Sequence, residues 1–563
     1  MASLFKIKNN ASSSLFFTMI TFLLFCITTT CSSTGGHWVQ LQRSIGISAM
    51  HMQVMNDNKV VIFDRTDFGP SNISLSNGRC RFNPRDMALK LDCTAHSVLY
   101  DLTTNTFRPL TIQTDAWCSS GALTPDGTLL QTGGFNDGYH KLRTFTPCPQ
   151  HNLCDWLELP QNLTSPRWYA SNQILPDGRI IVVGGRNAFT YEFVPTRDTA
   201  SFHYLRFLRL TRDPNPGEEN NLYPFLHLLP DGNLFIFANR RSVLFDYNRH
   251  RILREYPIMP GIEKRNYPST GSSVLLPLNL TGFGPDRTRL PVAEVMICGG
   301  AYPGVFTLAR RFRVFLEASR TCGRIRVSDP KPGWVMETMP IPRVMPDMIL
   351  LPTGNVMILN GAANGTAGWE NAANPVFYPV LYRPGLPDPL QRFQLLSPAN
   401  TPRMYHSAAV LLPDGRVLVG GSNPHRVYDF RGPYPTELSL DVYYPDYFEP
   451  ESEPLRPSII AVEAVNNTAP YGGLFAVTFS LRDYRAVPGV SVTLVAPSFT
   501  THSFAMNQRV VVLDVVAVDE VAPSSYKVTV RGPPSLTVAP PGYYMLYIVH
   551  AGIPSVSVWV QVR

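Results

Sequence analysis

Short apolar runs, each following a tight polar turn, recur along most of this chain. Residues 180–183 follow the turn Pro176-Asp177-Gly178, residues 417–419 follow Pro413-Asp414-Gly415, and both runs end at a pair of glycines. Runs of this length, rich in Val, Ile and Leu and bounded by Pro, Asp and Gly, predict β-strands joined by turns. Because few segments have helical periodicity, we expect an all-β protein.

Aligning these turns divides most of the chain into seven units. The spacing runs from about 47 to 75 residues, and the shorter intervals match the roughly 50-residue period of kelch repeats. We therefore expect a seven-bladed kelch-type β-propeller, in which four-stranded blades surround a central channel. The turns centre on Asn56-Asp57-Asn58, Pro125-Asp126-Gly127, Pro176-Asp177-Gly178, Pro230-Asp231-Gly232, Leu276-Pro277, Pro352-Thr353-Gly354 and Pro413-Asp414-Gly415.

The repeat stops at a proline-rich segment, residues 444–457. Beyond it, apolar runs continue without Pro-Asp-Gly turns, and about 105 residues of this pattern predict a small immunoglobulin-like β-sandwich. The strands expected there span residues 475–481, 490–495, 510–518, 526–530 and 543–549.

The first residues have the pattern of an export signal. Lys6 and Lys8 precede an apolar stretch over residues 15–27, and small residues follow up to Gly35. This order predicts a secretory signal peptide. No later segment approaches the roughly 18 apolar residues of a membrane helix, so we expect no membrane span. The expected division is a signal peptide over residues 1–36, a propeller over 37–450 and an immunoglobulin-like domain over 451–563.

The cysteines fit an oxidising compartment but leave one over. Of nine, Cys26 and Cys31 lie in or beside the signal peptide, so an odd number remains and at least one lacks a disulfide partner. Pairing by proximity leaves Cys118 unpaired, although other pairings remain open. The local pairs are Cys80 with Cys93, Cys148 with Cys154 and Cys298 with Cys322.

Composition limits the kinds of molecule that we expect this protein to bind. Five Asn-X-Ser/Thr sequons, at Asn72, Asn162, Asn279, Asn364 and Asn466, agree with export and predict glycosylation. A net charge of +7 without a dense Lys/Arg run argues against nucleic-acid binding. A mildly basic surface is compatible with association with an acidic polysaccharide matrix such as a cell wall, although a solvated surface explains it more simply.

One repeat position carries chemically active residues. It lies seven residues before the turn, and equivalent positions in a ring of repeats face the same axis. Cys118, Tyr169 and His406 are therefore expected to converge, with Tyr405 beside His406. A structural alternative is that the inner strands simply bury varied side chains. The seven residues at this position are Ala49, Cys118, Tyr169, Tyr223, Thr270, Met345 and His406.

No compact metal motif is present. None of the twelve histidines are spaced at i, i+2 or i, i+4, so a metal site has to be assembled from distant segments.

Four separate motifs resemble the copper-radical oxidases, most closely the glyoxal oxidase type, which is similar to galactose oxidase in core architecture. The resemblance extends over nearly the whole mature chain. The motifs are Ala116-Trp117-Cys118-Ser119, Arg167-Trp168-Tyr169-Ala170-Ser171, Arg403-Met404-Tyr405-His406-Ser407, and the segment from Thr501-His502-Ser503 to Arg509.

The resemblance implies one mononuclear copper. Tyr169 is the equatorial ligand, covalently joined through its ring to the sulfur of Cys118, which makes a protein-derived radical cofactor. Tyr405 is the axial tyrosine, and His406 and His502 are the nitrogen ligands. His502 comes from a C-terminal-domain loop that enters the propeller channel. Imidazole and phenolate suit Cu(II).

The family mechanism assigns the catalytic roles. Tyr405 acts as a base toward the substrate hydroxyl, the Tyr169 radical takes hydrogen from carbon, and O2 leaves as hydrogen peroxide. For glyoxal oxidase-like members the substrate is an aldehyde hydrate and the product is a carboxylic acid. The tryptophan with which galactose oxidase shields its radical is replaced here by Asn187; Trp117 or Trp168 covers the radical instead, or packs between blades.

The expected function is thus a secreted, monomeric copper-dependent aldehyde oxidase. Its partners are a small-molecule aldehyde and O2, and its location is the extracellular space, which in a plant means the apoplast or cell wall. Two alternatives stay open. One is oxidation of primary alcohols or sugars, and the other is a non-catalytic kelch module that binds glycans or proteins.

Overall fold

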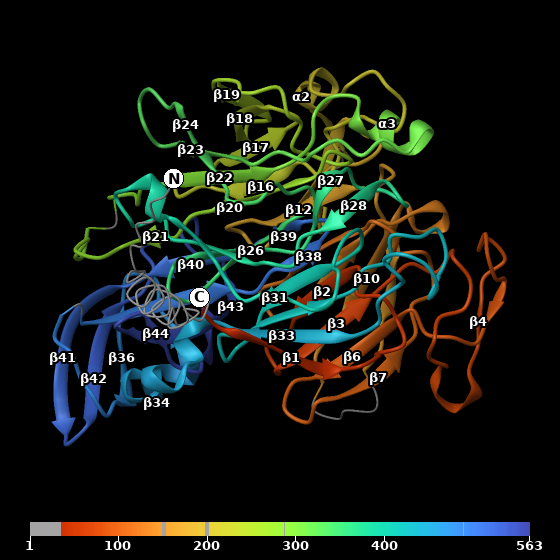
Figure 1. The fold of residues 1–563 in the computed structure, drawn as a ribbon. Helices are drawn as coiled ribbons and strands as arrows, with labels where there is room; N and C mark the ends of the chain where they lie inside the picture. The colour runs from red at the N-terminus through yellow and green to blue at the C-terminus, as the bar shows by residue number, and fades with distance from the viewer. Residues whose placement is uncertain (1–34, 149–153, 197–201, 287, 488) are drawn as a thin grey trace, which may run out of the picture.

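The computed structural model describes residues 35–148, 154–196, 202–286, 288–487 and 489–563 (Figure 1). The expected signal peptide lies outside the described residues except for Gly35 and Gly36. Within the described ranges, no helix is long and apolar enough to cross a membrane.

Two short β-ribbons and seven larger sheets make up the described part of the chain before residue 445. One larger sheet has six strands: β2 (His51–Val54), β3 (Lys59–Phe63), β6 (Ser97–Asp101) and β7 (Thr106–Leu110), with β38 (Phe499–Thr501) and β39 (Phe504–Met506) added beside β2. The ribbons are β4-β5 (Arg81–Phe82, Leu91–Asp92) and β27-β28 (Ala362–Gly365, Ala372–Pro375).

The other larger sheets have four strands each. The first two are β8 to β11 (Ser120–Leu123, Leu129–Thr132, Lys141–Phe145, Leu157–Asn162) and β12 to β15 (Ala170–Ile174, Ile180–Gly184, Thr190–Val194, His203–Tyr204). The next two are β16 to β19 (Phe225–Leu228, Leu234–Ala238, Arg241–Asp246, Arg251–Glu255) and β20 with β22, β23 and β24 (Gly271–Leu275, Glu294–Gly299, Thr321–Arg326, Trp334–Thr338). The last two are β25, β26, β29 and β30 (Asp347–Leu350, Val356–Leu359, Val380–Tyr382, Phe393–Leu395) and β31 to β33 with β1 (Ala408–Leu411, Val417–Gly420, Leu440–Tyr444, His37–Gln42). Two helices, α2 (Arg206–Leu210) and α3 (Val305–Phe312), lie in the connections.

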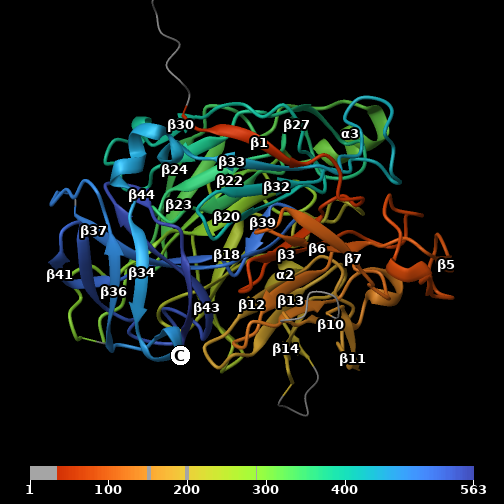
Figure 2. The same cartoon turned by 90° about the horizontal axis from the view of Figure 1, so that it is seen from below.

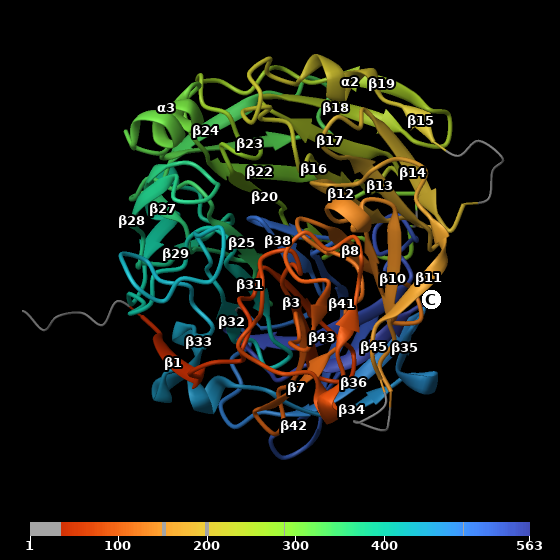
Figure 3. The same cartoon turned by 90° about the vertical axis from the view of Figure 1, so that its right-hand side faces the viewer.

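Neighbouring sheets pack face to face, which explains the uninterrupted apolar runs in the sequence. Strands β3, β13 and β17 are buried along their whole length. Ile180 and Val182 of β13 share a buried cluster with Leu130 and Leu142 of the preceding sheet. A strand covered on both faces gains nothing from alternating polar residues. Figure 3 shows the sheets grouped around a common centre.

The first strand completes the last sheet of this series. Strand β1 runs antiparallel to β33, with His37 opposite Tyr444. Segments about 400 residues apart therefore share one sheet. Strand β1 lies beside the strands of the last repeat rather than those of the first (Figure 3).

Most strands after residue 457 form two further sheets, one of which also includes β21 from the earlier part of the chain (Figure 2). Their buried residues share clusters with residues of the preceding sheets. One has the order β34-β36-β42-β41 and the other β21-β40-β37-β43-β45-β35, with β44 against β43. In the order given, the strands of the first sheet span Ser458–Glu463, Leu474–Ser480, Ser525–Arg531 and Asp514–Ala522. In the order given, those of the second span Leu278–Asn279, Arg509–Val512, Val490–Ala496, Gly542–His550, Val558–Val562 and Thr468–Ala469, and β44 spans Ile553–Pro554.

One detail of this segment differs from the sequence prediction. The single strand expected over residues 510–518 divides at Leu513 into β40 and β41, which belong to different sheets. The hairpin β38–β39 leaves the C-terminal sheets altogether and pairs with β2, where Thr501 lies opposite His51. This pairing places the turn after Thr501 among the inner strands of the preceding sheets.

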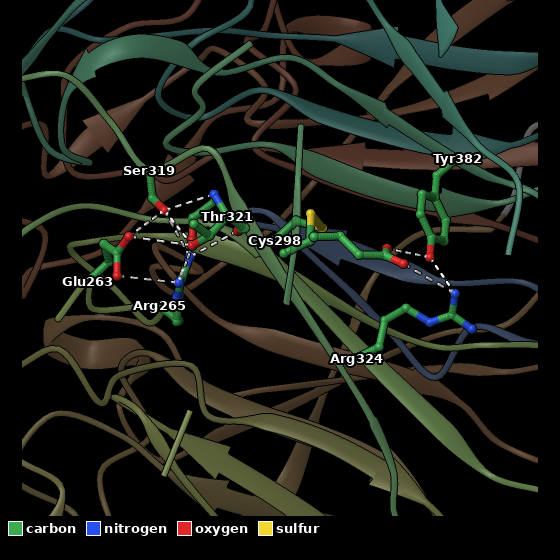
Figure 4. The surroundings of a disulfide bond; sticks show 10 residues. Glu263, Arg265, Cys298, Ser319, Thr321, Arg324 and Tyr382 are labelled. Carbon is green, nitrogen blue, oxygen red and sulfur yellow. Dashed lines mark hydrogen bonds and ion pairs between the residues drawn. A yellow bond between two sulfur atoms is a disulfide. The ribbon is translucent and has the colours of Figure 1, made fainter. Parts of the chain in front are cut away.

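The three disulfides join the pairs predicted by proximity: Cys80–Cys93, Cys148–Cys154 and Cys298–Cys322. The disulfide Cys298–Cys322 joins the paired strands β22 and β23, and Figure 4 shows its surroundings. In the same region, the buried Arg265 donates a hydrogen bond to the hydroxyl of Thr321. Among the described cysteines, Cys118 alone is free, and it is buried.

Candidate metal centre

The repeat position singled out in the sequence has a recurring backbone conformation. Five of its seven residues adopt left-handed backbone, with φ between +51° and +66°. Left-handed backbone costs a non-glycine residue about 1 kcal/mol, so it persists only where the surrounding structure imposes it. The five residues are Cys118, Tyr169, Tyr223, Met345 and His406.

Main-chain hydrogen bonds connect these positions from sheet to sheet. The amide of Tyr169 donates to the carbonyl of Cys118 (2.9 Å), and the amide of Tyr223 donates to the carbonyl of Tyr169 (2.9 Å). The amide of Met345 donates likewise to the carbonyl of Thr270 (2.7 Å). Equivalent residues of successive repeats therefore lie side by side, as the alignment of turns predicts.

Cys118, His406 and His502 meet at this centre. One ligand atom from each lies within 4.8 Å of the others. The Cys118 Sγ is 3.1 Å from Nε2 of His502. His502 stands in the turn between β38 and β39, so the C-terminal hairpin delivers it.

The two imidazoles are held neutral with free nitrogens. Burial lowers the pKa of both His406 and His502 well below the usual value, so their ring nitrogens keep lone pairs. The Nδ1 of His502 lies 2.7 Å from the Thr501 hydroxyl, which leaves Nε2 to face the centre. Neither ring nitrogen of His406 has a hydrogen-bond partner although the residue is buried. Such orphaned buried nitrogens fit a metal ligand.

The two predicted tyrosine ligands are joined by a third tyrosine. The Tyr169 hydroxyl donates to the Tyr267 oxygen (3.1 Å), and the Tyr267 and Tyr405 oxygens are 2.9 Å apart. The Tyr405 ring stacks on His406 with centroids 3.8 Å apart. Burial raises the pKa of Tyr169 and Tyr405 well above the usual value and that of Tyr267 to about 12, so without a metal all three are protonated at neutral pH.

Sequence reasoning did not find Tyr267. It belongs to the segment Asn266-Tyr267-Pro268, three residues before Thr270, which occupies the repeat position. An alignment that considers only the repeat position, seven residues before each turn, does not include Tyr267. Including the three residues on either side of that position adds both Tyr267 and Tyr405.

The free thiol at the centre is also held in its protonated form. Burial raises the pKa of Cys118 well above its usual value, and a contact with the Tyr169 side chain offsets part of this effect. The thiol is therefore protonated and packed against the phenol with which the resemblance pairs it.

A cavity of about 230 Å³ opens beside the tyrosines. Trp168 is the tryptophan that contacts the Tyr169 ring, with centroids 4.7 Å apart. Trp117 instead stacks on Trp369 at 5.3 Å. The cavity is lined by Trp117, Trp168, Tyr169, Arg186, Gly217, Glu219, Leu222, Tyr267, Phe306, Arg310, Gly368, Trp369, Asn371 and Tyr405; Asn187 is not among them.

The donor set suits one transition-metal ion. Two neutral imidazoles and two phenol oxygens match the ligand preference of Cu(II), and a metal here would provide a partner for one of the two unpartnered nitrogens of His406. The fold and this set of buried donors define the class: an all-β protein whose C-terminal domain completes a redox-type metal centre.

The chain belongs to the glyoxal oxidase family. The family model "Glyoxal oxidase N-terminus" matches residues 50–447, and the model "Galactose oxidase-like, Early set domain" matches residues 456–562. The chain is 45% identical over 527 residues to aldehyde oxidase GLOX of Vitis pseudoreticulata, covering 93% of this chain and 97% of that protein. It is 43% identical over 533 residues to aldehyde oxidase GLOX1 of Arabidopsis thaliana, covering 94% and 84%.

A solved structure supports the fold. A fungal alcohol oxidase in complex with copper superposes with a TM-score of 0.68 at 18% identity, covering 94% of this chain and 99% of that one.

Proposed function

We propose that this protein is a copper-radical oxidase that converts aldehydes to carboxylic acids and reduces O2 to H2O2. One observation carries the proposal: the ligand atoms of Cys118, His406 and His502 lie within 4.8 Å of one another. Tyr169 and Tyr405 stand at the same centre, linked through Tyr267, and the cavity brings substrate to their hydroxyls.

Tyr169, Tyr405, His406 and His502 are the proposed copper ligands. Cys118 is proposed to be crosslinked to Tyr169 through a thioether. Bound copper supplies one oxidising equivalent, and the crosslinked phenol supplies the second. The match of His406 and His502 to neutral nitrogen ligands supports this assignment.

The tyrosines move the hydrogens of the substrate. Water adds to the aldehyde to give a hydrate with a hydroxyl on the reacting carbon. The Tyr405 Oη, kept deprotonated by the copper that Tyr405 would hold, accepts the hydroxyl proton, while the Tyr169 oxygen takes the hydrogen atom from carbon. The overall reaction consumes aldehyde, water and O2 and yields carboxylic acid and H2O2, so two electrons pass from carbon to oxygen. The Trp168 ring covers one side of Tyr169 and limits access of water to it.

The architecture behind this site is proposed to be a closed ring of seven blades over residues 37–450, followed by an immunoglobulin-like domain over residues 451–563. The pairing of β1 with β33 supports closure, because it ties the ends of the ring together. The disulfides support secretion into the extracellular space, since such bonds persist in oxidising compartments. We propose that the protein acts there as a monomer.

Peptide mass spectrometry of copper-exposed protein tests the radical cofactor. A crosslinked peptide containing Cys118 and Tyr169, lighter by a pair of hydrogen atoms than the separate peptides, is expected. The thiol then resists alkylation after denaturation. Two separate peptides and an alkylated Cys118 contradict the proposal and favour Cys118 as a direct copper ligand with His406 and His502, the donor set of electron-transfer sites.

Peroxide formation tests the reaction. Copper-loaded, oxidised protein is expected to turn over glyoxal-type aldehydes faster than galactose or other primary alcohols. Faster turnover of alcohols assigns the protein to alcohol oxidation instead. No peroxide from any aldehyde or alcohol, together with no copper binding, favours a non-catalytic binding module.

A further inference from the structure

The mouth of the active-site cavity carries an arginine with no carboxylate partner. Phe306 and Arg310 lie one turn apart on α3 and both line the cavity. Arg310 is exposed, and among the described residues no carboxylate lies within ion-pair distance of it; its guanidinium is 5.8 Å from the centre of the Phe306 ring. A cation in this position is available to a ligand.

The nearby carboxylates are already engaged. Glu219 lines the cavity but contacts two guanidinium groups, with its Oε1 3.2 Å from Nη2 of Arg186 and 3.8 Å from Nη2 of Arg212. Glu218 accepts hydrogen bonds from the amide of Gly304 (2.6 Å) and the hydroxyl of Thr307 (3.1 Å). Glu218 thereby fixes the first turn of α3 over the cavity, and neither carboxylate neutralises Arg310.

A glycine keeps the space next to Arg310 open. A Cβ on Gly217 would stand 3.0 Å from the Phe306 ring and 3.7 Å from Nη1 of Arg310. The absence of a side chain there leaves the guanidinium facing the cavity rather than covered. Among the charged residues that line the cavity, Arg186 and Arg310 outnumber Glu219, so the site favours an anionic ligand.

The walls between this cation and the tyrosines are flat and aromatic. Trp168, Trp369, Phe306 and Tyr267 are among the residues that line the cavity. Aromatic side chains of this kind pack well against planar, unsaturated molecules. The cavity volume of about 230 Å³ admits a single substituted ring.

We propose that Arg310 is a specificity-determining residue that binds a carboxylate on the substrate, so that the site favours a flat aldehyde bearing a negative charge away from the reacting carbon. This inference rests on the proposed aldehyde oxidation. An aldehyde of this class is oxidised to a dicarboxylate, with water and O2 consumed and H2O2 released. Guanidinium groups recognise carboxylates through paired, charge-assisted hydrogen bonds, which a lysine does not reproduce.

Steady-state kinetics with a matched pair of substrates test the assignment. The ratio of kcat/KM for 4-formylbenzoate to that for 4-methylbenzaldehyde is expected to fall about tenfold in Arg310→Gln, the lower end of what a charge-assisted hydrogen bond contributes. Arg310→Lys is expected to lose part of the ratio. Arg311→Gln is the matched control, because Arg311 is exposed on the same helix and does not line the cavity. Added salt should lower the ratio in the wild-type protein and not in Arg310→Gln.

A binding measurement separates this inference from the proposed reaction. Quenching of tryptophan fluorescence by 4-methylbenzoate and by 4-methylbenzamide reports binding without turnover, since Trp168 and Trp369 line the cavity. The wild-type protein should bind the benzoate about tenfold more tightly than the amide, and Arg310→Gln should lose this preference. Selective binding without oxidation of any aldehyde overturns the proposed reaction but supports the role of Arg310. Equal binding of the two probes, or a preference unchanged in Arg310→Gln, overturns the role of Arg310 even if aldehydes are oxidised.

Discussion

The backbone amide of Tyr169 donates a hydrogen bond to the carbonyl oxygen of Cys118, across the boundary between two sheets, with a distance of 2.9 Å. Both residues have left-handed backbone, at φ of +66° and +52°. The two side chains are in contact, since a hydrogen bond with the Tyr169 side chain partly offsets the rise in the pKa of Cys118. The main chain therefore holds the phenol and the thiol close together, as the proposed thioether requires.

We expect Cys118→Ser to remain folded and to lose nearly all activity. The hydroxyl is close in size to the thiol but cannot form a thioether, so the phenol loses the substituent that eases its oxidation. Peroxide release with an aldehyde substrate should fall at least a hundredfold, or by about 3 kcal/mol in barrier. Intact-mass and thermal-unfolding measurements check that the protein is otherwise unchanged. Activity within tenfold of the wild type contradicts a catalytic thioether.

The hydroxyl of Tyr267 is predicted to assist proton movement between the two catalytic tyrosines. Tyr267→Phe keeps the ring but removes the oxygen that lies 3.1 Å from the Tyr169 oxygen and 2.9 Å from that of Tyr405. We expect kcat to fall by about 100-fold, the lower end of the range for one positioned proton-transfer group, with KM changed less.

A larger solvent isotope effect on kcat separates this role of Tyr267 from a packing role. Tyr544→Phe is the control, because the Tyr544 hydroxyl donates to the Pro540 carbonyl (2.9 Å) and lines no part of the cavity. An equal loss in both variants argues for general damage to the fold.

The turns define the repeat, and the repeat defines which residues are neighbours, so the proximity of Cys118 and His406 follows from the sequence pattern, while their roles are proposals. The shared φ of Cys118, Tyr169 and His406 follows from that equivalence. The repeat alignment does not predict Tyr267, because this residue lies three positions away from the repeat position. The alignment also does not predict that β1 pairs with β33 or that β38 pairs with β2, since contacts between such distant segments leave no local pattern in the sequence. The charge imbalance at Arg310 depends on which carboxylates are already paired, and only the structure shows this.

Thr501 is predicted to orient the His502 ligand. Its hydroxyl lies 2.7 Å from Nδ1 of His502, so the tautomer that donates to Thr501 presents the lone pair of Nε2 to the metal. Thr501→Val should weaken copper affinity about 10- to 100-fold, as outer-sphere partners of metal ligands typically do. A competition titration with a copper chelator measures the change.

Thr500→Val is the matched control for Thr501→Val. The Thr500 hydroxyl lies 3.1 Å from that of Ser498, and no interaction joins it to the metal ligands in the described structure. This variant should keep wild-type copper affinity. A similar loss in both variants assigns the effect to hairpin stability rather than to the orientation of His502.

Asp347 is predicted to make stability fall as the pH rises toward neutrality. Burial raises its pKa to about 7, partly offset by a hydrogen bond from Asn360 (2.7 Å), and its Oδ1 has no partner. In the unfolded chain an aspartate has a pKa of about 3.9, so between these values the folded state binds more protons. The unfolding free energy should therefore decrease from about pH 4 to pH 7, by up to roughly 4 kcal/mol from this group alone. Asp347→Asn cannot ionise, so the difference in denaturation midpoint between wild type and variant should shift in favour of the variant by pH 7.5 relative to pH 5. A difference that is independent of pH shows that Asp347 ionises normally in the folded protein.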